Sequence, residues 1–425
     1  MKKWIALGAV VVLLGAGAFW WAGEATPRPV VRLPDGSQIG LDRVSFGKTH
    51  RYIFGTPWQR LIWMLPDKLA AKLAGNVSGQ TFSTAEPSLA LWFHWRNRSP
   101  NGYTEFVLAD DSGFESSATA NSYSFGTGID LIEGRSFTAF PRRAKYVTVN
   151  VYRRDASWLP HRVAQFKFKN PVSGPFAQWT PEARPMQKKA GDLDVALTRL
   201  VTGVKNDRVL KAATNGFTDA WTQAIFRMSR QGQTITNWAP VRIEMTDATG
   251  NTAVNSTWSN WTENDRQVMC YRWSLWPNEP AWKVRIELSR TSGFQSNELW
   301  TIQNFPVPPA GGYIETNLQR TIGGFTVRVR GLTADGVTLP GSYNSFGGSP
   351  SLHFEIISPL KTNRFTLVSV KDDLGHEVPQ GGSSLSATEF AYGLRIPAEA
   401  KTITFTVALH ASRFADFLVK PERLK

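Results

Sequence analysis

Cysteine is nearly absent from this sequence. Cys270 is the one cysteine among 425 residues, so the chain cannot form an internal disulfide framework or a metal site that needs several thiolates. It lies in the segment VMCYRW, which is typical of a strand. We therefore expect the Cys270 side chain to be buried rather than reactive.

The motifs of common catalytic sites are missing as well. There is no G-x-S-x-G nucleophile turn, no P-loop and no G-x-G-x-x-G at the start of a helix. The six histidines stand singly, without the paired spacing that a zinc site requires. Two S-x-x-K matches, Ser45–Lys48 and Ser358–Lys361, lie in turn- and strand-like stretches without the K-T-G strand of penicillin-binding enzymes. The sequence predicts a protein that is not an enzyme and holds no cofactor.

Long hydrophobic runs are limited to the N-terminus. After Lys2 and Lys3 the chain carries no charge up to residue 22, which matches the ~20 residues of a membrane-spanning helix. The lysines favour a cytoplasmic N-terminus, and Trp20-Trp21 suits the opposite interface. We predict a transmembrane anchor in residues 1–23, with the remainder outside the cytoplasm. The alternative is a signal peptide cleaved after Ala16-Gly17-Ala18, which would leave a secreted or periplasmic protein.

One pattern of strand, acidic turn and proline-led strand occurs three times. The D-x-x-G turns are Asp110–Gly113, Asp247–Gly250 and Asp372–Gly375. Each is followed by an apolar residue and a proline, namely Phe140-Pro141, Trp276-Pro277 and Ile396-Pro397. Strands of alternating polarity close the three copies: VTVNV (Val147–Val151), VRIEL (Val284–Leu288) and ITFTV (Ile403–Val407). In such turns the Asp side chain binds amides of its own loop and Gly takes a positive φ.

The repeat predicts an all-β fold of three tandem β-sandwich modules. We place the modules at residues 30–171, 192–308 and 317–425, with proline-rich connectors between them. In size and strand rhythm they resemble immunoglobulin-like domains, although the Cys…Trp…Cys core of antibody domains is absent.

The first module also contains a segment of helical periodicity, residues 57–75. Its leucines recur at every fourth position from Leu61 to Leu73. We predict a short helical insertion that caps one end of the sandwich. The alternative is a basic amphipathic segment that rests on the membrane near the anchor.

Tryptophan is abundant, with 17 residues, many of them in the second module. Trp276 precedes the repeated proline, where the other copies carry Phe140 and Ile396, so we expect it in the core. Trp258 and Trp261 lie instead in the polar stretch NSTWSNWTEND, without an obvious packing role. Because indole faces stack well on sugar rings, these two residues are the candidate ligand-binding site, for a glycan.

The chain is basic, with a net charge of +14 spread along its length. No nucleic-acid-reading motif accompanies the charge, and an exported chain rarely meets nucleic acid. Anionic envelope polymers or lipid headgroups are better partners. The doublets Asp110-Asp111 and Asp372-Asp373 lack the twelve-residue calcium loop, so we interpret them as turns and predict no metal site.

These observations together predict a membrane-anchored, extracytoplasmic protein of the cell envelope that is not an enzyme. Its modules would serve protein interaction or a structural role. The alternative is a protein that binds a glycan or anionic envelope polymer through Trp258 and Trp261.

Overall fold

The computed structural model describes most of the chain after residue 29. The described ranges are 30–53, 79–98, 104–116, 120–125, 131–154, 160–172, 174–204, 221–256, 259–263, 266–271, 274–322, 325–342, 349–357, 363–385 and 388–424. The predicted anchor (residues 1–23) and the predicted helix (residues 57–75) lie outside them. Over the described ranges, no helix is long and apolar enough to cross a membrane.

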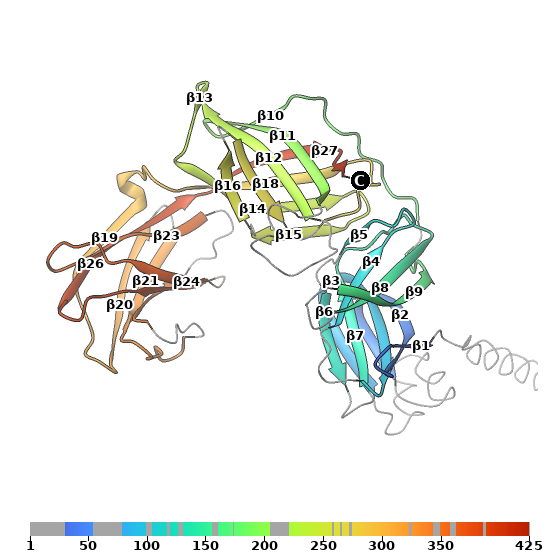
Figure 1. Cartoon of the computed structure of the whole chain (residues 1–425). Coiled ribbons are helices and arrows are strands. Elements are labelled where there is room, and N and C mark those ends of the chain that lie inside the picture. Colours follow the sequence, from blue (N-terminus) through green and yellow to red (C-terminus); the bar gives the residue numbers. More distant parts are fainter. Residues whose placement is uncertain are drawn as a thin grey trace, which may run out of the picture.

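The first strand group, at the lower right of Figure 1, consists of two antiparallel sheets. Sheet A has the order β1-β2-β3-β7-β6 and contains β1 (Val30–Arg32), β2 (Gln38–Ile53), β3 (Gly79–Arg96), β6 (Ala120–Phe125) and β7 (Leu131–Phe137). Sheet B has the order β5-β4-β8-β9 and contains β4 (Thr104–Ala109), β5 (Glu115–Ser116), β8 (Tyr146–Arg154) and β9 (Pro160–Lys169). Phe93 of sheet A packs on Phe106 and Phe166 of sheet B, with ring centroids 4.6 and 5.9 Å apart. The apolar faces of the two sheets thus share one core.

The second strand group also has two sheets. Sheet C has the order β10-β11-β12-β17-β16, with β13 on β12 and β28 on β11. Its strands are β10 (Met186–Ala190), β11 (Leu193–Val204), β12 (Trp221–Arg230), β13 (Gln233–Thr234), β16 (Ser259–Glu263), β17 (Arg266–Tyr271) and β28 (Glu422–Arg423). Sheet D has the order β15-β14-β18-β27 and contains β14 (Trp238–Asp247), β15 (Thr252–Ser256), β18 (Trp282–Arg290) and β27 (Arg413–Val419). Residues of both sheets belong to the same hydrophobic cluster, which extends into the first group.

The third strand group has its own hydrophobic cluster. Sheet E, of order β19-β26-β23, contains β19 (Leu299–Pro306), β23 (Asn363–Asp372) and β26 (Thr402–Ala411). Sheet F, of order β20-β21-β22-β25-β24, contains β20 (Tyr313–Ile322), β21 (Phe325–Thr333), β22 (Ser351–Ile356), β24 (Gln380–Leu385) and β25 (Glu389–Leu394). Phe354 of sheet F packs between Phe365 and Phe405 of sheet E, at 4.9 and 5.9 Å. A 3-10 turn, η1 (Ser296–Glu298), precedes β19.

The all-β prediction is confirmed for the described residues, whose strands form six sheets. Cys270, in β17, is 2% exposed, as expected. Burial disfavours the thiolate and raises the pKa of Cys270 to about 11. Trp276 is 3% exposed and lies in the core, also as expected.

The C-terminal segment belongs to a different group than its position in the sequence suggests. Residues 413–424 fall in the range predicted for the third module, 317–425. However, β27 pairs with β18 along its whole length, and β28 pairs in parallel with β11. The red arrow of β27 therefore lies within the second group in Figure 1. Ala415, Phe417 and Val419 point into that group's core, where each is at most 2% exposed. Alternating polarity predicts a strand but does not choose its neighbour, so sheet membership differs from the predicted boundary here.

The three D-x-x-G turns have the same geometry. In each turn the aspartate side chain accepts hydrogen bonds from the backbone N–H groups two and four residues later, at 2.8–3.1 Å. In each, the glycine N–H donates to the aspartate carbonyl, and its φ lies between 74 and 88°. Asp110, Asp247 and Asp372 thus occupy equivalent positions, as the repeat predicts.

We expect unequal effects from removing these carboxylates. Asp247 is 2% exposed and also accepts a bond of 2.8 Å from the Asn251 amide, so Asp247→Ala leaves several buried donors unsatisfied. The free energy of unfolding should fall by about 3 kcal/mol. Asp372→Ala should cost less, because His376 beside it is exposed and water can replace the lost acceptor. Urea denaturation followed by tryptophan fluorescence measures both. Equal losses would contradict this ranking.

Candidate functional site

The structure describes little of the predicted tryptophan pair. Trp258 lies outside the described residues. Trp261 belongs to β16, the edge strand of sheet C, where its backbone pairs with Val268 of β17. Its side chain is outside the description too, so the glycan prediction for this pair stays a prediction.

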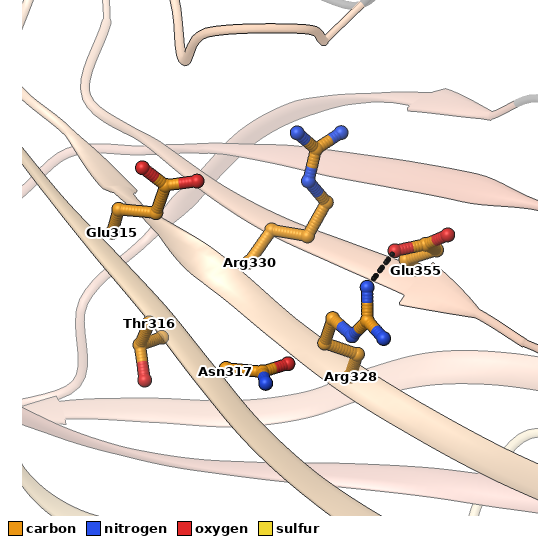
Figure 2. Close-up of a pocket in the computed structure, with 6 residues that line it drawn as sticks. All are labelled: Glu315, Thr316, Asn317, Arg328, Arg330 and Glu355. Carbon is orange, nitrogen blue, oxygen red and sulfur yellow. Dashed lines mark hydrogen bonds and ion pairs between the residues drawn. The ribbon is translucent and has the colours of Figure 1, made fainter.

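Sheet F carries an open polar hollow on the face that points away from its core (Figure 2). Its volume is about 720 Å³, and it is lined by Glu315, Thr316, Asn317, Arg328, Arg330 and Glu355. Val327 and Val329, which alternate with the arginines along β21, are fully buried on the opposite face. The alternation in FTVRVRGL therefore places both guanidinium groups in the hollow.

Glycine and a β-bulge shape the wall of this hollow. A Cβ atom on Gly331 would lie 2.1 Å from the Ile314 carbonyl oxygen, and the φ of Gly331 is +156°. Only glycine lets β20 approach β21 this closely. The register between the two strands then shifts between Glu315 and Leu318. The bulge carries Thr316 and Asn317 out of the regular ladder and into the lining.

The charges of the hollow alternate in sign. Arg328 Nη1 donates to Glu355 Oε2 at 3.0 Å, the pair marked in Figure 2. Arg330 donates to Glu389 Oε1 at 3.1 Å and to the Pro340 carbonyl at 2.9 Å. These pairs are partly exposed, so each contributes little to stability and can exchange partners at low cost.

A buried histidine lies next to Arg330 in the same sheet. His353 is 2% exposed, and its Nδ1 lies 3.5 Å from Ser342 Oγ. Burial, together with the positive charge of Arg330, lowers the pKa of His353 to about 4. The imidazole is therefore neutral at pH 7 and adds no charge to the hollow.

The hollow has the chemistry of a polar contact surface. Its donors and acceptors are fixed on strands, and none of the six described residues that line it is aromatic. Among the residues that the structure describes, no cluster of three or more His, Cys, Asp or Glu side chains could hold a metal ion. An alternating-charge surface suits an extended partner with complementary charges better than a neutral sugar ring, which needs a stacking face.

A smaller apolar recess lies beside β27. It has a volume of about 290 Å³ and is lined by Trp179, Glu182, Lys283, Asp416, Phe417 and Leu418. The connector before β10 reaches it because Glu182 N–H donates to the Leu418 carbonyl at 2.7 Å, against the edge of sheet D. Trp179 lies in the predicted proline-rich connector between the first two modules, residues 30–171 and 192–308. A tryptophan within a polar, proline-rich stretch was the feature of the sequence that could have indicated this recess.

The first and second strand groups meet through equivalent elements. We call the D-x-x-G turn and the apolar-proline loop of a group its tip: residues 110–114 with 140–143, 247–251 with 276–279, and 372–376 with 396–399. Asn251 of the second tip accepts from Phe140 N–H at 3.1 Å and donates to the Phe140 carbonyl at 2.9 Å. In return, Asn278 donates to Asp110 of the first tip at 2.9 Å. Each turn thus binds the loop of the other group.

Charged side chains and the C-terminus complete this junction. Arg143 Nε lies 2.8 Å from a carboxylate oxygen of Glu279, whose pKa is raised by burial. Arg142 donates to the Thr249 carbonyl at 2.9 Å. From the segment after β27, Lys420 donates to the carbonyls of Pro277 and Glu279 at 2.8 and 2.5 Å. The junction is therefore densely bonded, and Lys420, directly after β27, supports the second tip from within the second group.

A second junction joins the second and third groups. Arg364 donates twice to Glu287, at 2.7 Å each, and Ser412 Oγ donates to the same carboxylate at 2.6 Å. Nearby, His410 Nε2 accepts from Arg290 N–H at 3.1 Å. His410 is 2% exposed, and burial lowers its pKa to about 4.

Because its pKa is lowered by burial, His410 should make the folded protein less stable in acid. Its pKa is about 6.5 in the unfolded chain and about 4 in the folded protein, so below pH 6.5 the unfolded state binds the proton first. The stabilisation present above pH 6.5 is lost as the pH falls toward 4. Between pH 7 and 4.5 we expect a loss of about 2 kcal/mol in the free energy of unfolding from this residue. His410→Gln should show that much less pH dependence in urea titrations, and an unchanged pH dependence would contradict the assignment.

Comparisons with known proteins do not assign the chain to a family. No protein-family model matches it, and no curated protein gives a significant match. One solved structure, of titin domains I67–I69 in an E-to-A mutated variant, matches with 9% identity and a TM-score of 0.13, over 80% of this chain and 93% of that one. Neither this identity nor this overlap assigns a function.

Proposed function

We propose that this protein is a non-enzymatic interaction scaffold of the cell envelope, built from three tandem immunoglobulin-like β-sandwich modules. An N-terminal helix in residues 1–23 would hold it in the membrane, with the strand groups outside the cytoplasm. Its partners would be envelope proteins, with no role for nucleic acid.

The observation that carries this proposal is the junction between the first two strand groups. Asn251 is 1% exposed and Glu279 is 5% exposed, yet both are hydrogen-bonded across the junction. Buried polar groups satisfied in this way fix one arrangement of the two groups rather than many. Strand groups held rigidly in this way would present the polar face of sheet F at a distance from the membrane anchor. This arrangement suits a scaffold that binds other proteins.

Membrane attachment is tested by fractionation of intact cells that make the protein. The retained anchor predicts that the full chain stays in the membrane after a high-pH wash and that its N-terminal sequence begins at Met1. A soluble product with a mature N-terminus near Phe19 would show the cleaved signal peptide instead.

The interaction role is tested by photo-crosslinking from the hollow. A photoreactive residue at Asn317 should yield a defined protein adduct in the envelope. The same residue at Val254, which is 40% exposed on β15, should not. Exchanging the charges in Arg328→Glu/Glu355→Arg keeps the ion pair but reverses the local field, so the adduct should be lost while the fold remains. An adduct of equal yield from both sites would refute the surface.

Glycan or anionic-polymer binding is the second candidate function, favoured by the apolar recess at Trp179. An indole beside Lys283 and Asp416 offers a stacking face and polar groups for hydroxyls. Retention on purified envelope polysaccharide should fall in Trp179→Ala or in Trp258→Ala/Trp261→Ala, and not in Tyr313→Ala, an exposed aromatic of β20. Unchanged retention of both tryptophan variants would remove this candidate.

A further inference from the structure

The junction between the first and second tips is reciprocal. The second turn binds the first loop through Asn251 and Phe140, and the second loop binds the first turn through Asn278 and Asp110. Arg143 and Glu279 hold the same position, second after the repeated proline, and they contact each other. Contact between equivalent positions is the mark of a two-fold interface. The tips therefore form a self-complementary surface that the chain uses once, between its own groups.

The third tip has the same backbone construction. Asp372 N–H donates to the His376 carbonyl at 3.0 Å, as Asp247 N–H does to Asn251 at 3.1 Å. In the loop, Ala400 N–H donates to the Pro397 carbonyl at 3.1 Å, as Ala144 N–H does to Pro141 at 3.1 Å. The backbone frame that carries this surface in the first two groups is thus present a third time.

The third tip is nevertheless open to solvent. Phe114 and Asn251, fourth after their aspartates, are 4% and 1% exposed. The side chain of the equivalent His376 is 71% exposed. Leu374, two residues earlier, is 68% exposed, the largest value among the exposed large apolar side chains of the described ranges.

The position of the third tip leaves it accessible. Asp372 pairs with Ile403 at the start of β26, whereas Asn363 pairs with Ala411, next to the junction with the second group. The tip therefore lies at the opposite end of the third group, on the far left of Figure 1.

The negative charge of Glu399 indicates which kind of partner the third tip would bind. Glu399 holds the position of Arg143 and Glu279, and it is exposed. The third tip thus carries an acid at this position, as the second does, and the second binds a tip with arginine there. Two identical third tips would bring two Glu399 carboxylates together, which opposes pairing.

We propose that the third tip is a docking face for a β-sandwich tip of another polypeptide that places a basic side chain opposite Glu399. The contact repeats the arrangement of the first two tips, with Leu374 and His376 covered by the partner's loop. This inference rests on the proposed scaffold role and names the class of partner. The crosslinking test at Asn317 concerns sheet F and not the third tip. The proposed scaffold role and the proposed docking face can therefore be refuted separately.

The full chain itself supplies the probe. Glu399→Arg creates a tip with arginine at the required position, and mixing it with the wild type recreates the charges of Arg143 and Glu279. Donor- and acceptor-labelled full chains in detergent should associate at least about tenfold more tightly in this mixture than in either protein alone. Adding Leu374→Asp to the Glu399→Arg chain should abolish the gain.

The matched control carries the same charge change elsewhere. Glu315→Arg alters sheet F, away from the third tip, and its mixture with wild type should gain nothing. Association of the control mixture to the same degree would indicate general charge attraction and overturn the proposal. Absence of a gain in the Glu399→Arg mixture would overturn it as well.

Discussion

Phe417→Ala is expected to lower the free energy of unfolding of the second strand group by about 4 kcal/mol. The side chain is 1% exposed and comes from β27. This strand pairs with β18 of sheet D, although it follows the strands of the third group in the sequence. Its removal leaves a cavity in a core that β18 and β27 close together. Urea denaturation followed by hydrogen exchange should place the loss in sheets C and D.

Phe414→Ala, in the same strand, is the matched control. Phe414 points to the outer face, where the guanidinium of Arg285 lies 4.5 Å from its ring. Its loss should amount to about 1 kcal/mol or less. If Phe414→Ala destabilised as much as Phe417→Ala, or if exchange increased only in sheets E and F, β27 would not be a core strand of the second group.

Asn251→Ala should also lower the free energy of unfolding strongly, by about 3 kcal/mol, because it removes the hydrogen-bond partners of several buried groups at once. The substitution removes both bonds to the Phe140 backbone and the bond to Asp247. Hydrogen exchange at the Phe140 amide should rise, because this N–H loses its acceptor. Tryptophan fluorescence and exchange mass spectrometry measure the two effects.

Asn278→Ala serves as the comparison at the same junction. Its side chain is exposed and makes one bond, of 2.9 Å, to Asp110. Water can replace that bond, so the loss should stay below about 1 kcal/mol. Equal effects of the two substitutions would mean that the junction is held by its apolar contacts alone.

The turns were predictable because their chemistry is local. D-x-x-G specifies an aspartate that binds amides two and four residues later and a glycine with positive φ, whatever the surroundings. The burial of Cys270 was equally accessible, because its strand segment is largely apolar, and the burial of Trp276 followed from its place before the repeated proline. These features depend on neighbours within a few residues.

The features that could not be predicted from the sequence depend on contacts between residues that lie far apart in the chain. β27 has the alternation of any strand, and its choice of β18 over a strand of the third group rests on contacts more than a hundred residues away. The hollow likewise requires Gly331 beside the Ile314 carbonyl and carboxylates from a neighbouring strand. The Arg143–Glu279 pair spans 136 positions. Sequence spacing carries no signal for such contacts.

The reciprocal tips lock the first two strand groups into one rigid body. Spin labels at Lys169 and Arg266, two exposed positions on either side of the junction, measure this directly by pulsed dipolar spectroscopy in a Cys270→Ala background. A locked junction should give one narrow distance distribution, which broadens in Asn251→Ala. A broad or multimodal distribution in the parent protein would contradict it.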